Sequence, residues 1–149
     1  MSIEQISADE AHRRCTADTT TVLLDVRTVR EFEDGHPAGA INVPIMVPGL
    51  RGLEPYPDFL DVVAAVVPKD VAVIATCRTG QRSMLAAQLM AHEGWTKLAN
   101  LRAGFAGHVN GYGQLVEAGW EGLALPVETG SPSDGRSLDD LRRKAGLED

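Results

Sequence analysis

Short apolar runs alternate along the chain with stretches whose apolar residues have helical spacing. Continuous apolar and β-branched runs occupy Thr21–Val26, Val71–Ala75 and Lys97–Leu101, and such runs are typical of strands buried on both faces. A shorter run, Ala40–Val43, is stopped by Pro44 and predicts one more strand. The strand-forming segments are therefore spread over the first two thirds of the chain.

The segments between these runs have helix signals. Ser7 and Glu10 have the spacing of a capping box, so a short helix is expected through about Arg14. Pro68 and Gly94 are helix-stop residues. The other predicted helices are Thr28–Asp34, Tyr56–Val67 and Ser83–His92.

Strands that alternate with helices need crossover connections, which produce parallel sheets. We therefore predict an α/β fold with a mostly parallel central sheet flanked by helices. Residues 44–57 contain several prolines and are expected to form an irregular loop. Residues 104–122 are rich in glycine and are expected to form loops around a short helix.

The composition changes near the carboxyl end. Residues 129–136 have the Gly, Ser, Pro and Asp content of a linker. Ser137–Gly146 is charged and helix-capable, with Leu138 and Leu141, but is too short to be a stable helix alone. We predict one domain, residues 1–128, followed by a linker and a mobile charged tail, residues 129–149.

Length and charge narrow the function classes. The 149 residues suit one domain, and 44% hydrophobic residues supply a core without disulfides. A net charge of −7 argues against nucleic-acid binding, which needs clustered Lys and Arg. No apolar run approaches the roughly 18 residues of a membrane span, and the amino end lacks a secretory signal. We expect a cytoplasmic protein with no membrane partner.

The segment after Val71–Ala75 carries the candidate chemistry. Cys77 ends a strand, and a polar loop leads into the next helix, where backbone N–H groups favour an anion. Arg78 and Arg82 add positive charge, and Gly80 permits a tight turn. This pattern favours a reactive Cys77 thiolate that needs no histidine. The alternative is a buried structural cysteine.

Cys15 and the four histidines show no pattern of a reactive thiol or of a metal site. Cys15 lies late in the first predicted helix, far from any cationic loop, and is interpreted as a packing residue. Neither cysteine belongs to a C-x-x-C pair, and the histidines have no metal-ligand spacing. No metal site is expected. The histidines are His12, His36, His92 and His108.

Separate motifs of this chain resemble those of the rhodanese domain family over about residues 3–127. The motifs are the Cys77 loop, Leu24–Arg27 with Glu31 and Phe32, Gly35–Pro44, Leu101–Gly104, and Gly119 with Trp120. The resemblance implies that the cysteine accepts a sulfane sulfur, becomes a persulfide, and passes the sulfur to a thiophilic acceptor. It implies a sulfurtransferase, or thiosulfate sulfurtransferase-like enzyme, with no metal or organic cofactor.

Carried onto this chain, the resemblance makes Cys77 the catalytic nucleophile. The charged loop is similar to that of thiosulfate-using members, so the donor is a small anion and the acceptor is cyanide, a thiol or a protein. The expected substrate-binding residues are Arg78, Thr79, Gly80, Gln81, Arg82 and Ser83.

Two other functions stay open. A phosphatase or an arsenate reductase can use the same thiolate, but related phosphatases have one more residue in a Cys-x5-Arg loop, and the shorter loop here favours a single sulfur atom over phosphate. A sulfur-relay or protein-binding module is the second alternative.

Some neighbouring residues also have two interpretations. Asp25 and Arg27 follow a strand and either orient the Cys77 loop or form a buried structural ion pair, which we favour. His36 is expected to form a structural hydrogen bond, and Trp95 and Trp120 to pack in the core or at its rim.

Overall fold

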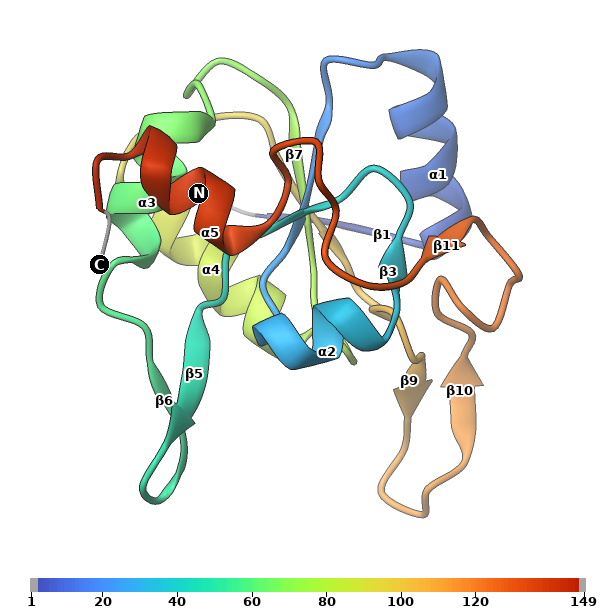
Figure 1. Ribbon diagram of the computed structural model, residues 1–149. Coiled ribbons are helices and arrows are strands. Elements are labelled where there is room, and N and C mark those ends of the chain that lie inside the picture. The colour runs from blue at the N-terminus through green and yellow to red at the C-terminus, as the bar shows by residue number, and fades with distance from the viewer. Residues whose placement is uncertain (1–2, 148–149) are drawn as a thin grey trace.

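Five short strands form one parallel sheet: β1 (Glu4–Ile6), β2 (Val22–Asp25), β4 (Ile41–Asn42), β7 (Val73–Thr76) and β8 (Leu98–Leu101). Their order is β1-β8-β7-β2-β4 in this computed structural model, which describes residues 3–147 (Figure 1). Every neighbouring pair is parallel, so the predicted α/β class is confirmed. The ends of the predicted domain and tail, residues 1–2 and 148–149, lie outside the described residues.

Helices cover both faces of this sheet (Figure 1). One face packs against α1 (Ala8–Ala17) and α2 (Val29–Asp34), and the other against α3 (Phe59–Val66), α4 (Gln81–His92) and α5 (Leu138–Lys144). Successive strand residues point to opposite faces, so both sets of side chains are buried in the central strands, which are apolar except for Asp25, Thr76 and Asn100 near their carboxyl ends. This burial is the physical cause of the continuous apolar runs.

Side-chain caps lie at the starts of α1 and α2. The Ser7 hydroxyl accepts from the Glu10 N–H at 3.1 Å, but the Glu10 carboxylate bonds to Arg14 at 2.8 Å instead of completing the box. The helix continues past Arg14 to Ala17. The full capping box lies at Thr28 and Glu31, at the start of α2.

Residues 44–57 do not form an irregular loop throughout, and this prediction was wrong. They contain an antiparallel hairpin of β5 (Met46–Gly49) and β6 (Gly52–Pro55), with Gly49 opposite Gly52. Gly52 has φ +106°, which suits the tight turn. Prolines are tolerated because a two-stranded ribbon leaves an edge of each strand unpaired.

The helix predicted within residues 104–122 is also wrong. That segment forms β9 (His108–Val109) and β10 (Leu115–Glu117), which pair antiparallel. The turn between them is held by the Asn110 side chain, which accepts from the Tyr112 and Gln114 N–H groups. Figure 1 shows this hairpin and the β5–β6 hairpin projecting on the same side of the molecule.

The tail is not a free segment. Its helix α5 packs against α3, Leu141 is only 3% exposed, and Leu138 joins the same apolar cluster. Arg142 hydrogen-bonds to the Tyr56 hydroxyl and to Asp58 at 2.9 Å. The preceding β11 (Val127–Glu128) pairs antiparallel with β3 (His36–Pro37). The predicted mobility was wrong, and the domain division after residue 128 stays a proposal.

No helix within residues 3–147 is both long enough and apolar enough to cross a bilayer.

The buried position of Leu141 predicts a loss of stability when its side chain is shortened. Leu141→Ala is expected to lower the free energy of unfolding by about 2–5 kcal/mol in urea titrations, because truncation of the buried side chain leaves a cavity in the core. Leu115, 61% exposed on β10, supplies the control, and Leu115→Ala is expected to stay within about 0.5 kcal/mol. Equal stabilities for the two variants would contradict the packing of α5 on the core.

Candidate active site

Cys77 follows β7 directly, and the loop after it turns back over its sulfur. The Gly80 N–H donates to Sγ at 3.1 Å, and the Ser83 hydroxyl oxygen lies 3.4 Å from Sγ. The residue is only 1% exposed. The sulfur is therefore buried beside a backbone N–H donor at the amino end of α4, and helix amino ends are positions that favour anions.

Close backbone contacts hold this loop in shape. The Phe105 N–H donates to the Cys77 carbonyl at 2.8 Å, and the Ala106 N–H to the Arg78 carbonyl at 2.9 Å. Gly80 has φ +97°, and a Cβ built on it would lie 2.1 Å from the Arg102 carbonyl oxygen. Because backbone cannot move aside as a flexible side chain does, Gly80 is required for both conformation and space.

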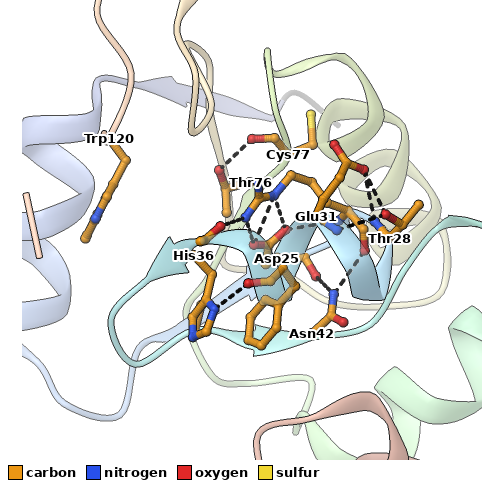
Figure 2. A network of polar contacts seen from close by, with 12 residues as sticks. Asp25, Thr28, Glu31, His36, Asn42, Thr76, Cys77 and Trp120 are labelled. Atoms are coloured by element: carbon orange, nitrogen blue, oxygen red, sulfur yellow. Dashed lines mark hydrogen bonds and ion pairs between the residues drawn. The ribbon is translucent and has the colours of Figure 1, made fainter. Parts of the chain in front are cut away.

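Arg82 reaches away from the loop opening to the first turn of α2. Its guanidinium makes two hydrogen bonds to the Glu31 carboxylate, at 2.8 and 3.0 Å. Burial raises the pKa of Glu31, but the Arg82 bonds and charge and the Thr28 donors outweigh it and lower the pKa from 4.5 to about 2. Figure 2 shows Glu31 and Thr28 gathered beside Cys77.

Arg78 differs from Arg82 in that its side chain is exposed. The Arg78 side chain has no hydrogen-bond or ion-pair partner among residues 3–147. The other predicted substrate-binding residues differ in exposure: Gly80 and Ser83 are buried, Thr79 is half-buried, and Gln81 is exposed. The structure thus brings the predicted residues into one loop and leaves Arg78 as its open cation.

Comparison with known proteins agrees with this architecture. A model of the rhodanese-like domain matches residues 7–110. This chain belongs to the rhodanese-like domain family. Thiosulfate sulfurtransferase 16, chloroplastic, of Arabidopsis thaliana is 40% identical over 83 residues, which are 56% of this chain and 69% of the relative.

Two further similarities have the same character. Protein HIGH ARSENIC CONTENT 1, mitochondrial, of Arabidopsis thaliana is 37% identical over 105 residues, 70% of this chain, and the chain spans only 58% of that relative's length. The crystal structure of Rv0390 from M. tuberculosis has a TM-score of 0.73 at 27% identity, and covers 87% of this chain and 100% of that one. The chain is therefore a rhodanese-domain protein related to sulfurtransferases.

Within this rhodanese-like domain, Asp25 and Arg27 form a buried ion pair, as favoured from the sequence. The closest contact is 2.8 Å, and Arg27 also donates to the Gly35 carbonyl at 2.6 Å. The ion pair is linked to the Cys77 loop through Phe105. The Arg27 guanidinium lies 4.5 Å from the centroid of the Phe105 ring, and the Phe105 N–H donates to the Cys77 carbonyl. Asp25 and Cys77 lie at the carboxyl ends of the neighbouring strands β2 and β7 (Figure 2).

The remaining candidates have structural positions. Burial raises the pKa of Cys15, which packs at the edge of the α1 core. His36 is buried, its Nδ1 lies 2.7 Å from the Phe32 carbonyl oxygen, and its ring stacks on Phe32. Trp95 and Trp120 are both core residues, and Figure 2 shows Trp120 apart from the cysteine.

Two residues of the site, Glu31 and Asn100, were not predicted from the sequence. Glu31 belonged to the motif that carried the resemblance, but no partner for it was foreseen, because Arg82 lies far away along the chain. Asn100 is a polar residue inside the apolar run Lys97–Leu101, yet it is buried and bonded to Ser83 and Gly80. A polar residue near the carboxyl end of a predicted buried strand was the available signal.

The Glu31–Arg82 pair predicts a pH-dependent stability. A carboxyl with a folded pKa near 2 stabilises the fold above its unfolded value of 4.5, and this contribution is lost as the pH falls from about 5 to 2. Glu31→Gln is expected to reduce that acid dependence by on the order of 1 kcal/mol, measured by urea unfolding at several pH values.

Glu33→Gln is the matched control, because Glu33 is an exposed residue of the same helix with no ion-pair partner among residues 3–147. It is expected to retain the wild-type acid dependence. If Glu33→Gln flattened the profile as much as Glu31→Gln, the effect would be general charge and not the pair with Arg82.

Proposed function

We propose that this protein is a sulfurtransferase that moves a sulfane sulfur from a small anionic donor such as thiosulfate to a thiophilic acceptor. The observation that carries the proposal is the Gly80 N–H donating to the Cys77 sulfur at 3.1 Å at the start of α4. The relationship to a protein named thiosulfate sulfurtransferase supports the choice of donor.

The proposed first step is attack by the Cys77 thiolate on the outer sulfur of thiosulfate. A bond forms between the two sulfurs, the S–S bond of the donor breaks, and sulfite leaves with its electron pair. In the second step an acceptor such as cyanide attacks the outer sulfur and leaves as thiocyanate, and the Cys77 thiolate is restored. Backbone N–H groups of residues 78–83 are the proposed donors to the outer sulfur.

The two arginines take different parts in this proposal. Arg78 is the exposed cation that attracts the donor dianion, whereas Arg82 is engaged with Glu31 and holds the loop against α2. Arg82 was predicted as a substrate-binding residue, and we now propose it as a positioning residue. Asp25 and Arg27 support the same loop indirectly through Phe105.

A phosphatase or arsenate reductase is the second candidate function. One relative is named HIGH ARSENIC CONTENT 1, which is a reason to test arsenate directly. The loop from Cys77 to Arg82 has one residue fewer than a Cys-x5-Arg loop, and this favours sulfur. Parallel assays with thiosulfate and cyanide, arsenate, and a phosphate ester separate these activities from a pure sulfur-relay module, which would form the persulfide without rapid turnover.

The cellular setting also stays a proposal. We propose a cytoplasmic enzyme without nucleic-acid or membrane partners, on the acidic composition. The two plant relatives are named chloroplastic and mitochondrial, so these compartments are the alternatives.

The cysteines provide the direct test of the proposed nucleophile. Incubation with thiosulfate is expected to add one sulfur atom to the wild-type protein by mass spectrometry, and cyanide is expected to remove it. Cys77→Ser should lose both steps, because a serine hydroxyl is not ionised at neutral pH. Cys15→Ser should retain both, and a sulfur carried by Cys15 would overturn the assignment.

The exposed arginine predicts a salt-dependent effect on donor use. Arg78→Ala is expected to lower kcat/KM for thiosulfate about tenfold at low salt and less at high salt, because screening weakens the attraction of the dianion. Alkylation of Cys77 by neutral iodoacetamide should change less than twofold.

Arg143→Ala, which removes an exposed arginine from α5, controls for net charge and is expected to leave both reactions unchanged. Arg82→Ala should slow both reactions, because it releases the loop from α2. Equal losses with both reagents in Arg78→Ala would instead assign Arg78 to loop structure.

A further inference from the structure

One buried carboxamide contacts both residues that contact the catalytic sulfur. Asn100 lies on β8, next to β7, and is 2% exposed. Its Oδ1 accepts from the Ser83 hydroxyl at 2.6 Å, and its Nδ2 donates to the Gly80 carbonyl at 3.2 Å. The Gly80 N–H donates to the Cys77 sulfur, and the Ser83 hydroxyl oxygen lies 3.4 Å from the sulfur, so the Asn100 side chain spans the turn that carries both groups.

The orientation of the carboxamide follows from its other partner. Nδ2 also donates to Gln5 Oε1 on β1 at 2.9 Å, so both of its hydrogens face acceptors. Reversing the amide would place an oxygen against two other oxygens, at a buried site where unpaired polar atoms are costly. Oδ1 therefore faces Ser83, and the Ser83 oxygen is held between Asn100 and the sulfur.

The Ser83 hydroxyl has one hydrogen and two acceptors, Asn100 Oδ1 and Cys77 Sγ. While Sγ is neutral, in the thiol or the persulfide, the carboxamide is the stronger acceptor. When the acceptor attacks the outer sulfur, the S–S bond to Sγ breaks and its electron pair stays on Sγ. Because hydrogen bonds to an ionised acceptor are about twice as strong as neutral ones, the hydroxyl then donates to the thiolate. No proton is transferred in this step.

We infer that Asn100 is a positioning residue for sulfur transfer, which holds the Ser83 hydroxyl and the Gly80 turn where both can stabilise the departing Cys77 thiolate. Only the part of this role that concerns sulfur transfer rests on the proposed function. The stabilisation of the thiolate is a property of the free protein and is measurable without any sulfur donor.

A second buried asparagine at the same end of the sheet provides a matched control. Asn42 on β4 is 1% exposed and donates to the Asp25 and Arg27 carbonyls at 3.1 and 3.0 Å. Its bonds are to the backbone of a neighbouring segment and not to the Cys77 loop. Loss of either carboxamide removes the two hydrogen bonds that its Nδ2 donates. Only Asn100 contacts the residues around Sγ.

The test is a double-mutant cycle on Cys77 alkylation by iodoacetamide as a function of pH. Asn100→Ala and Ser83→Ala are each expected to slow alkylation at neutral pH about tenfold and to move its half-maximal rate to higher pH. The double variant should be no slower than the slower single variant, because Asn100 acts through Ser83 and its turn. Asn42→Ala should lose stability but keep the wild-type alkylation profile.

Two results would overturn the inference: losses that multiply to about a hundredfold in the double variant, or an equal loss in Asn42→Ala. If Asn100→Ala fails to fold, Gln5→Ala replaces it, since Gln5 is exposed and anchors Nδ2. A two- to threefold slowing is expected there, and an unchanged rate would contradict the role.

Sulfur transfer is measured on the same variants. Asn100→Ala is expected to lower kcat about tenfold with KM for thiosulfate within twofold, because Arg78 is untouched. If the wild-type protein transfers no sulfur, the proposed function fails, while the alkylation cycle still decides the role of Asn100.

Discussion

The backbone contact between the Cys77 loop and the segment after β8 is the constraint on which the candidate site depends. Carbonyls of Cys77 and Arg78 accept hydrogen bonds from Phe105 and Ala106, and these bonds draw the two segments together. Such an approach leaves no room for side chains: a Cβ on Gly104 would lie 2.5 Å from the Arg78 carbonyl oxygen. The loop therefore closes over the sulfur, and the Gly80 N–H points at Sγ.

Charge around the sulfur is arranged locally and against the overall charge of the molecule. The chain carries a net charge of −7, so an anion that approaches the protein meets a repulsive field at long range. Of the two loop arginines, one is neutralised by Glu31 and serves to hold the loop, and Arg78 stays open to solvent. This division gives the loop one ion-paired support and one exposed cation.

The carboxyl-terminal helix belongs to the same structural unit as the cysteine. Cys77 and Leu141 lie in one apolar cluster, between the sheet and the helices α3, α4 and α5. The opposite face has its own cluster, with Phe32 and Phe105 beneath the loop. The strand that presents the cysteine is thus buried on both sides.

The sequence by itself determined the order of the main elements along the chain. These are the apolar runs Thr21–Val26 and Val71–Ala75, the helices between them, and a cysteine at a strand end before a cationic loop. These features are local, since burial on two faces and helix capping leave their mark within a few residues. The two hairpins and the docking of the helix-capable tail were missed, because proline, glycine and charge content describe composition, whereas pairing and docking depend on distant partners. Only the tertiary structure decided that Arg82 meets Glu31 and that Asn100 holds Ser83, because such contacts join residues that are far apart in the chain and adjacent only once the parallel sheet has formed.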